Sequence, residues 1–559
     1  MSAVLAAPVR LDVRARAAYA EGAGIYRILP RAVAAPARLD DLAPLLRWAR
    51  ETGAAVIPRG AGSAMGGGNV GDGLVLDLTG LDERRIGIDA HHRTARAAAG
   101  ATGGAINRAA HRFGLRLAPN PSSLAFATSA GLASTNAAGS RSFRCGSVRR
   151  WIAGVDLVTA DGEHLGLDRG RPADPGVAAV ARFERTAAPA IRQARATIQQ
   201  RFPRTRKNSS GYALDAWLQS GDLLDLLIGA EGTLGIITAV RWTLERVPLA
   251  RGGLRIAVLD DDELMYALEV LRELGATSIE LLDRTFLRFV ADSLSDATRH
   301  LALRSGAILL AEFEGASDQV HASLRSARGR LGTQVYEATA SYGEAALEAL
   351  WAIRHAASPL LARLGPGRRS LQVIEDGCVP VDRLPRYLAV LRAIPDRYGV
   401  EAVVFGHAGD GHLHVNLLPD TTRPGWEAVL QTIFDEVSLE LLALGGTPSG
   451  EHGDGRLRSG LMERLYGAEV LALFRAVKLA FDPDSILNPG VILAEPRRAG
   501  ATREQTRAPE ANPISRLKAG DGAVELPADI ARALRDIEQS GSWETERLVL
   551  ADRLPDATV

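Results

Sequence analysis

The segment 403–416 constrains the fold more than any other part of the chain. An apolar run is followed by a glycine-rich, histidine-bearing stretch and then by a second, alternating run. Asp410-Gly411 favours a two-residue hairpin turn because both residue types tolerate the positive φ of a type I′ turn. We therefore predict an antiparallel hairpin with Asp410 and Gly411 as its turn, which places His407 directly opposite His414.

One face of this hairpin collects residue types that bind metals. Side chains alternate along a strand, so His412, His414 and Asn416 share a face of the second strand. Three of the chain's 11 histidines lie within eight residues here. Two imidazoles held on a stiff hairpin form half of a divalent-metal site. The alternative is a histidine-rich turn without a shared ligand.

A third metal ligand is expected in the segment Ser449-Gly450-Glu451-His452-Gly453. Its glycines permit close approach of the backbone. Adjacent side chains of an extended segment point to opposite sides, so Glu451 would join the imidazoles while His452 faces a substrate bound to the metal. That arrangement sets a Lewis acid beside a general base. Taken alone, the Glu-His-Gly sequence would indicate only a capped loop.

Composition limits the classes of partner and cofactor. A chain of 559 residues is long enough for two or three domains. Its 66 basic residues balance 66 acidic ones, which gives no electrostatic case for nucleic acid or an anionic membrane as partner. Two cysteines, Cys145 and Cys378, exclude a disulfide framework and a four-cysteine iron–sulfur cluster.

The chain shows no segment that would target it to a membrane. No apolar run approaches the length that spans a bilayer, and the first 20 residues lack the pattern of a secretory signal. A cytoplasmic location is expected, with a peripheral position at the inner membrane or an organelle transit peptide as alternatives.

Four stretches of small residues indicate a long, phosphate-bearing cofactor. The first, 58–68, follows a predicted strand, and such loops turn backbone N–H groups toward phosphate oxygens. Its glycine spacing fits neither the Rossmann fingerprint nor a Walker loop. Three more stretches occupy 119–123, 131–139 and 229–238. Any one of them would usually be a loop, but together they predict one cofactor laid across a domain.

The sequence pattern changes after Pro248, and this change predicts a separate substrate domain. An amphipathic helix is expected at 461–480, a flexible linker at 495–524 and a short amphipathic helix at 527–540. Between residues 254 and 446, helical patterns alternate with strand-like runs at 254–259, 307–313, 370–374 and 402–405.

Together these motifs resemble the vanillyl-alcohol-oxidase-like FAD flavoproteins, in particular the D-lactate, glycolate and D-2-hydroxyglutarate dehydrogenase branch. The resemblance implies an α+β fold, with a PCMH-type FAD-binding domain of two subdomains and an α/β cap containing an antiparallel sheet. A C-terminal helical segment would return to the FAD domain. The expected boundaries are 1–247 (FAD-binding domain), 248–446 (cap), 447–495 (C-terminal segment) and 496–559 (linker and helical tail). The segments that carry the resemblance are 58–68, 131–139, 229–238, 406–416, 450–453 and Asn488-Pro489-Gly490.

The resemblance places most cofactor-binding residues in the small-residue stretches. The pyrophosphate would be wrapped by Arg59, Gly60, Ala61, Gly62 and Ser63. The flavin would be lined by Gly131, Ser134, Asn136 and Gly139, with Pro119 in the second stretch. Glu231 and Ile237 are assigned to the adenosine half, and Asn488 to the surroundings of the isoalloxazine. No His or Cys stands where a covalent tether is expected, so the FAD is expected to be non-covalent.

The resemblance also assigns the reacting residues. Asn416 and His452 match residues at the reacting hydroxyl, and Arg354 matches an arginine that binds the substrate carboxylate. His412 replaces a more usual Asn, which would either add a ligand or alter the ligands' surroundings. Zinc is the expected metal, with manganese or iron as alternatives, and its ligands would be His407, His414 and Glu451.

These assignments predict metal-assisted oxidation of a small D-2-hydroxy acid by hydride transfer to the flavin, with D-lactate favoured. The segment 368–380 offers Arg368 and Arg369 but also Glu375 and Asp376, which disfavours a dicarboxylate substrate. Electrons would pass to an external quinone, electron-transfer flavoprotein, cytochrome or iron–sulfur protein, and a homodimer is an open expectation. The alternatives are a metal-free flavin oxidase or lyase of the same fold, or a non-catalytic FAD subunit of a glycolate-oxidase-like complex.

Overall fold

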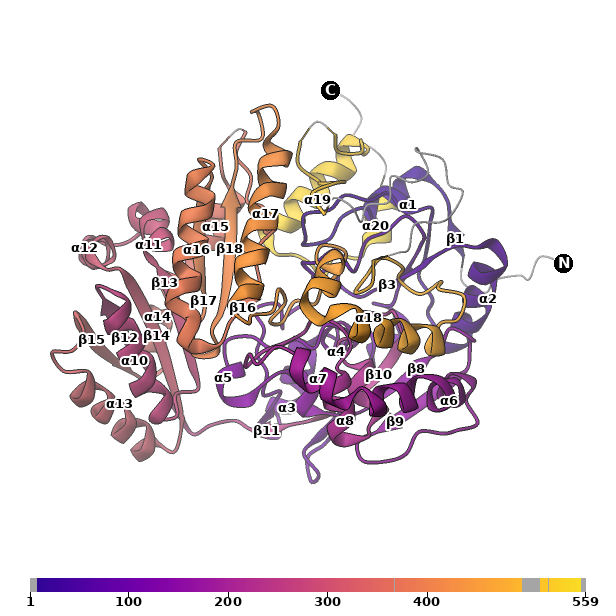
Figure 1. Cartoon of the computed structure of the whole chain (residues 1–559), viewed down its shortest axis with the longest axis horizontal. Helices are drawn as coiled ribbons and strands as arrows, with labels where there is room; N and C mark the ends of the chain where they lie inside the picture. Colours follow the sequence, from indigo (N-terminus) through magenta and orange to yellow (C-terminus); the bar gives the residue numbers. More distant parts are fainter. Residues whose placement is uncertain (1–7, 366, 495–512, 521, 554–559) are drawn as a thin grey trace.

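Three extended sheets organise the chain, two in its first half and one in its middle (Figure 1). The computed structural model describes residues 8–365, 367–494, 513–520 and 522–553. Most of the predicted linker therefore lies outside the described residues.

The first sheet has mixed strand directions and ends at the first glycine-rich loop. Helix α2 (Leu42–Thr52) is amphipathic, buries Leu42, Leu45 and Leu46, and ends at Gly53, whose φ of 65° favours glycine. The strand β3 that follows leads directly into the loop. The strand order is β1 (Val9–Arg10), β2 (Ala32–Ala34), β4 (Leu74–Asp77) and β3 (Val56–Arg59), with the last three parallel.

The second sheet is antiparallel throughout and completes the FAD-type half of the fold. Helix α18 (Met462–Phe481), predicted at 461–480, packs against α6 (Ala178–Gln193), so the chain returns to this half after the cap (Figure 1). The strand order is β5 (Ile86–Asp89), β6 (Thr94–Ala98), β10 (Ile236–Thr243), β8 (Ile152–Val158) and β9 (His164–Asp168). A further pair joins β11 (Glu245–Arg246) to β7 (Leu115–Arg116).

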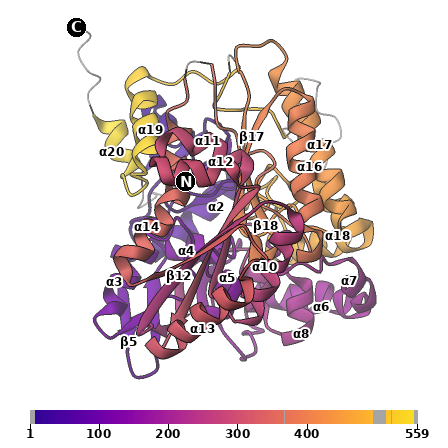
Figure 2. The same ribbon diagram turned by 90° about the vertical axis from the view of Figure 1, so that its left-hand side faces the viewer.

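The cap is built on a seven-stranded antiparallel sheet whose two faces are both covered. Along β14, Leu309 packs into one apolar cluster and its neighbours Ile308 and Leu310 into another, because side chains alternate between faces. Figure 2 shows α14 on one side of this sheet and α16 and α17 on the other. The strand order is β15 (Glu337–Tyr342), β12 (Ala250–Val258), β14 (Ala307–Gly315), β13 (Ser278–Asp283), β17 (Glu401–His407), β18 (His412–Leu418) and β16 (Gly377–Cys378).

Helices fill the remaining layers. One face of the cap sheet packs against α10 (Asp261–Glu273), α13 (Ser317–Leu331), α16 (Leu384–Arg397) and α17 (Trp426–Ala443). The other packs against α11 (Arg284–Val290), α12 (Asp296–Arg304), α14 (Glu344–His355) and α15 (Ala357–Ala362). The FAD-type half adds α3 (Gly103–His111), α4 (Ser129–Ser134), α5 (Ser142–Cys145), α7 (Arg195–Arg201), α8 (Leu214–Ser220) and α9 (Leu223–Leu227). None of the described helices is long and apolar enough to cross a membrane.

One predicted strand does not form. The segment 370–374 makes only a bridge between Leu371 and Leu417 rather than a strand of the sheet. The reason lies just beyond it, where Asp376 adopts a φ of 80° that turns the chain out of an extended path. The other three strand-like runs of the cap are confirmed as β12, β14 and β17.

The tail helix predicted at 527–540 is confirmed as α19 (Ala528–Ser540), and a second helix, α20 (Arg547–Asp552), follows it. Both pack on α1 (Val13–Ala18) at the N-terminal end of the chain (Figure 1). Ile530, Leu534 and Ile537 form the apolar stripe of α19.

Leu534→Ala is expected to loosen this docking. The leucine is 4% exposed, and removing a buried leucine side chain costs about 2–5 kcal/mol. Hydrogen–deuterium exchange of the α19 amides should therefore accelerate, while exchange in α18 stays unchanged. Arg535→Ala, at the exposed neighbouring position, is the matched control; equal exchange in the two variants would contradict the docking seen here.

Candidate functional site

A cavity of about 750 Å³ lies between the FAD-type half and the cap, within the range of small-molecule and cofactor sites. Its wall brings together segments far apart in sequence, including the loop after β3, the segment 120–141 and the hairpin β17–β18. All four of the predicted small-residue stretches contribute residues to this wall. Predicted cofactor residues in this wall are Arg59, Gly60, Ala61, Gly62, Ser63, Gly131, Ser134, Gly139, Glu231 and Ile237.

The glycine-rich loop forms one end of the cavity with its backbone. A Cβ added to Gly60 would lie 2.2 Å from Thr128 Oγ1, so only glycine fits there. The buried Arg59 guanidinium donates to the carbonyls of Tyr19 and Glu21, among others, and so holds the loop from behind. A wall of closely packed backbone suits the oxygens of a pyrophosphate, and the residues present therefore fit an FAD.

Three of the predicted cofactor residues lie outside the cavity wall. Pro119 and Asn136 are absent from it, although their neighbours in sequence line it. Asn488 is buried and donates through Nδ2 to the carbonyls of Gly68 and Glu231, at 2.8 Å each. These residues shape the segments behind the wall, and their contact with the cofactor stays a prediction.

The histidine hairpin forms, but its turn is longer than predicted. A 3₁₀ turn at Ala408–Asp410 and Gly411, at a φ of 71°, connects the strands. His407 therefore pairs with His412, and the predicted pairing with His414 is wrong by two residues. Because the side-chain period of a strand is two, this shift leaves all three imidazoles on one face.

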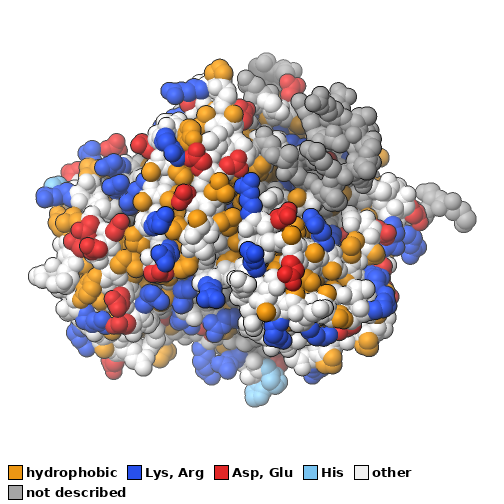
Figure 3. All heavy atoms as spheres, in the orientation of Figure 1, with side chains coloured by type: hydrophobic (Ala, Val, Ile, Leu, Met, Phe, Trp, Pro, Cys, Tyr) orange, Lys and Arg blue, Asp and Glu red, His pale blue; other side chains and the backbone are white. Residues whose placement is uncertain are grey.

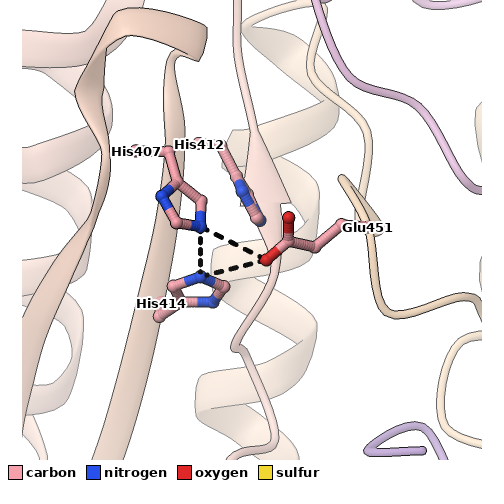
Figure 4. Close-up of side chains that lie close together, drawn as sticks. All are labelled: His407, His412, His414 and Glu451. Carbon is pink, nitrogen blue, oxygen red and sulfur yellow. Dashed lines mark hydrogen bonds and ion pairs between the residues drawn. The ribbon is translucent and has the colours of Figure 1, made fainter. Parts of the chain in front are cut away.

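Two imidazoles and one carboxylate converge at the end of this face (Figure 4). The Nε2 atoms of His407 and His414 lie 3.2 Å apart, and Oε1 of Glu451 lies 3.3 and 3.4 Å from them. Tetrahedral ligands about 2.1 Å from a zinc ion stand about 3.4 Å from one another. The three predicted ligand atoms thus form a triangle of the size that a tetrahedral metal needs.

Charged neighbours set the orientation of His407 and the protonation states of His407 and Glu451. The Glu280 carboxylate contacts Nδ1 of His407, which directs Nε2 toward the shared point. Burial lowers the pKa of His407, but Glu280 outweighs it and raises that pKa. Burial likewise opposes ionisation of Glu451, yet Lys207, 2.9 Å from Oε2, holds the Glu451 pKa well below its usual range. Glu451 is therefore a carboxylate, as a metal ligand must be.

His412 is not free to act as a ligand. Its Nε2 lies 2.8 Å from Oδ1 of Asp376, and its Nδ1 lies 3.2 Å from Nζ of Lys207. Burial, followed by Lys207, lowers the pKa of His412 to about 3, so the ring is neutral. Of the two roles left open for this residue, the structure favours altered surroundings over a fourth ligand.

His452 lies on the same side as Glu451, contrary to the prediction for an extended segment. Its ring stacks on His414 with centroids 5.1 Å apart, and its Nε2 is 3.5 Å from Oε1 of Glu451. Glu231 shapes the segment by accepting from the backbone N–H groups of Asp454 and Gly455, which bends it out of an extended path.

Two acidic residues orient His452. Nδ1 lies 2.7 Å from Oε2 of Glu375, whose other oxygen accepts from Arg458, and Asp376 accepts from the backbone N–H of His452. Burial lowers the pKa of His452, but Asp376 and Glu375 outweigh it and raise that pKa well above its ordinary value. The raised pKa favours the protonated ring, which lines the cavity with its Nδ1 held by Glu375.

The remaining two predicted residues also line the cavity. Arg354, on α14, stacks on Phe405 at 4.0 Å, and its Nε lies 3.5 Å from Oε2 of Glu280. Asn416 accepts through Oδ1 from Ser370 and Gln372, so its amide nitrogen is left for other partners.

Sequence reasoning missed four residues of the site: Lys207, Glu280, Glu375 and Asp376. Glu375 and Asp376 had been weighed only against a dicarboxylate substrate, whereas both bind histidines. A usable signal existed for Lys207, because this arginine-rich chain retains only three lysines. Nothing local distinguishes Glu280, which reaches the site from another strand of the sheet.

Two family descriptions match different parts of the chain. Residues 30–168 match the family described as "FAD binding domain", and residues 259–492 match "FAD linked oxidases, C-terminal domain". The D-lactate dehydrogenase of Archaeoglobus fulgidus is 29% identical over 83% of this chain and 93% of its own length. The glycolate oxidase subunit GlcD of Bacillus subtilis is 28% identical over 86% and 92%. The D-2-hydroxyglutarate dehydrogenase of Escherichia coli is 29% identical over 84% of this chain, which spans about half (48%) of that relative.

Solved structures show the same fold. A 4-ethylphenol oxidase from Gulosibacter chungangensis superimposes with a TM-score of 0.63 at 17% identity, over 88% of this chain and 95% of that one. A p-cresol methylhydroxylase gives 0.61 at 15% identity, over 87% and 94%. The chain therefore carries the FAD-binding and C-terminal domains of FAD-linked oxidases, has the vanillyl-alcohol-oxidase-like fold, and is similar to a D-lactate dehydrogenase, a D-2-hydroxyglutarate dehydrogenase and a glycolate oxidase subunit.

Proposed function

We propose that this chain oxidises a small D-2-hydroxy acid, D-lactate in the first place, to the 2-oxo acid with the help of a divalent metal. The observation that carries the proposal is the triangle of His407, His414 and Glu451, beside a histidine oriented by two carboxylates. The names of the relatives at 28–29% identity support the substrate class.

The three ligand atoms would hold the metal, with zinc expected on their N, N, O composition and spacing. A bound divalent ion would polarise the substrate hydroxyl and lower its pKa. Lys207 and Glu280 fix the protonation state and orientation of the ligands from outside the triangle. His412, held between Asp376 and Lys207, supports the wall behind them.

Side chains of the cavity would position the substrate and take its proton. Arg354, poised between Phe405 and Glu280, binds the carboxylate through its guanidinium, whose fork matches two oxygens. A divalent ion held by the neighbouring ligands would disfavour the protonated form of His452. The neutral ring would then accept the hydroxyl proton at Nε2 while Glu375 holds Nδ1. The bound FAD supplies the isoalloxazine that takes up the hydride from C2 of the substrate. Loss of one proton and one hydride converts the hydroxy acid to the oxo acid.

Charge pairing within the cavity supports a substrate with one carboxylate. Arg251 donates to Glu312 and Glu344, and Arg141 lies 3.4 Å from Glu314. Arg251 is thus already matched by two acids, whereas Arg141 shares Glu314 with Arg116. A second substrate carboxylate at Arg251 would have to displace one of its pairs, which favours D-lactate or glycolate over a dicarboxylate at that position.

The substrate and the need for metal can be tested together. We expect D-lactate to reduce a dye acceptor fastest in a panel with glycolate and D-2-hydroxyglutarate. Incubation with a chelator should abolish this activity, and added Zn²⁺ or Mn²⁺ should restore it. Activity that persists after complete metal removal would instead favour the metal-free flavin oxidase or lyase, and no flavin reduction by any hydroxy acid would favour a non-catalytic subunit.

His414→Ala is expected to release the metal without releasing the flavin. Loss of one of three ligands should lower bound metal, measured by elemental analysis, from about one ion per chain to a small fraction. The flavin absorbance should remain, because His414 lies away from the glycine-rich loop. His321→Ala, on α13 beside Tyr342, is the matched control. Retention of a full metal complement by His414→Ala would argue against the assigned ligands.

His452→Gln should slow flavin reduction by roughly 10²- to 10⁴-fold, the usual contribution of a general base. The measurement is anaerobic stopped-flow absorbance with D-lactate at saturation. Metal content and flavin content should both stay at wild-type levels. A reduction rate within a few-fold of wild type would show that another group takes the proton.

A further inference from the structure

The C-terminal tail reaches the end of the cavity where the glycine-rich loop lies. Neither matched family region extends past residue 492, yet α19 and α20 dock on α1 through a continuous apolar cluster. An ion pair between Arg14 and Asp529, at 2.6 Å, fixes their orientation. In Figure 1 the two yellow tail helices lie beside indigo α1, which connects β1 and β2 of the first sheet.

Arg547, the first residue of α20, is buried and forms no ion pair with an acid among the described residues. It is 5% exposed, and its Nε and Nη2 atoms have no hydrogen-bond partner. Burial, with a contribution from the nearby Arg59, lowers the pKa of Arg547 to about 9. Of the nearby acids, Glu21 pairs with Arg27. Asp77 accepts from Tyr19 and Thr79, and it lines a side cavity together with Arg547 without a hydrogen bond to it. A buried guanidinium in this state is costly unless a ligand completes its surroundings.

The surroundings of Arg547 open toward the cofactor cavity. A side cavity of about 160 Å³ is lined by Arg547 together with Gly60, Ala61 and Thr128, which also line the main cavity. Trp543 lines both cavities and lies 6.4 Å from the ring of Phe126 across their junction. The guanidinium of Arg547 lies over the Trp543 ring, 5.6 Å from its centroid.

We propose that the tail completes the FAD site, with Arg547 binding the cofactor's pyrophosphate and Trp543 closing the cavity over it. A pyrophosphate on the backbone of Gly60 and Ala61 would supply the anion that Arg547 lacks. Arg59 is less available for this role, because three of its five N–H groups donate to backbone carbonyls. This inference depends on FAD binding and is independent of the substrate and of the metal.

A purely structural role for Arg547 predicts a different outcome. If Arg547 only held the tail in place, its removal would destabilise the protein without cofactor. If its partner is the pyrophosphate, Arg547→Gln removes an unmatched buried charge, so the cofactor-free protein should melt at the same or a higher temperature. The loss should then appear only with ligand, as a smaller rise in Tm on adding FAD.

The experiment uses the full chain stripped of flavin and titrated with FAD and with ADP. ADP carries the diphosphate without the flavin, and tryptophan fluorescence follows binding of both ligands. Arg547→Gln should raise the Kd of each roughly 10- to 100-fold, as expected for one charge-assisted hydrogen bond to a buried anion. Arg547→Lys should fall between this variant and wild type. Arg535→Gln, exposed on α19, is the matched control and should bind like wild type.

The fluorescence change on adding ADP should shrink in Trp543→Phe, which places the reporter at the tail. Unchanged Kd values in Arg547→Gln, or a lower Tm without ligand and no change in affinity, would overturn the proposal. A wild-type chain that binds neither FAD nor ADP would overturn the FAD assignment along with it. Wild-type binding with an unaffected Arg547→Gln would overturn the tail's role alone.

Discussion

One carboxylate joins the three parts of the molecule at the candidate centre. Oε1 of Glu451, from the C-terminal segment, faces the two imidazoles of the cap hairpin. Oε2 accepts from the backbone N–H of Gly139 at 2.7 Å and from Lys207, both in the FAD-type half. Each partner stabilises the ionised form, so the FAD-type half, the cap and the C-terminal segment meet on a single buried charge. Movement of any one part would leave that charge unmatched, which is costly in a buried site.

The same part of the structure shows what the sequence could and could not predict. Strand alternation was enough to gather His407, His412 and His414 on one face, because that inference depends only on a period of two. The register was not predictable from the Asp-Gly pair, which favours a two-residue turn. The observed turn is longer, and the backbone of Val379 leaves no room for a side chain at Gly411 within it. The three histidines share one face in both registers, so the predicted ligand atoms still converge, and the metal itself stays a prediction.

Long-range partners marked the limit of prediction. Glu280 reaches His407 from β13, 127 residues earlier, and Lys207 reaches Glu451 across 244 residues. Such contacts follow from how the cap sheet is ordered, with β13 beside β17, and no local pattern encodes that order. The surface gave no further guidance. On the face drawn in Figure 3, basic and acidic side chains of the described residues are interspersed.

Four of the nine described non-glycine residues with positive φ lie in or beside segments that line the cavity. Asn136, Glu231, Asp376 and Asn488 all hold positive φ angles, of 52°, 49°, 80° and 42°. Non-glycine residues adopt such angles at a cost that persists where surrounding contacts dictate them. Each of these side chains is buried, and three of them bind backbone around the site: Glu231 at 454–455, Asp376 at 451–452, and Asn488 at Gly68. At these turns, polar side chains therefore form hydrogen bonds with loops that lack regular secondary structure, and these bonds hold the loops in place.

The two ends of the cavity differ in how they satisfy charge, and this difference explains why the tail matters. At the hairpin end, four buried acids each contact a histidine or a cation: Glu280, Glu375, Asp376 and Glu451. The ligand atoms of His407, His414 and Glu451 lie close together there. At the loop end, Nε and Nη2 of Arg547 have no hydrogen-bond partner among the described residues. The pyrophosphate of a bound FAD would supply an anion for Arg547. The loop end thus leaves donors that a cofactor would satisfy, whereas these four acids of the hairpin end are already paired.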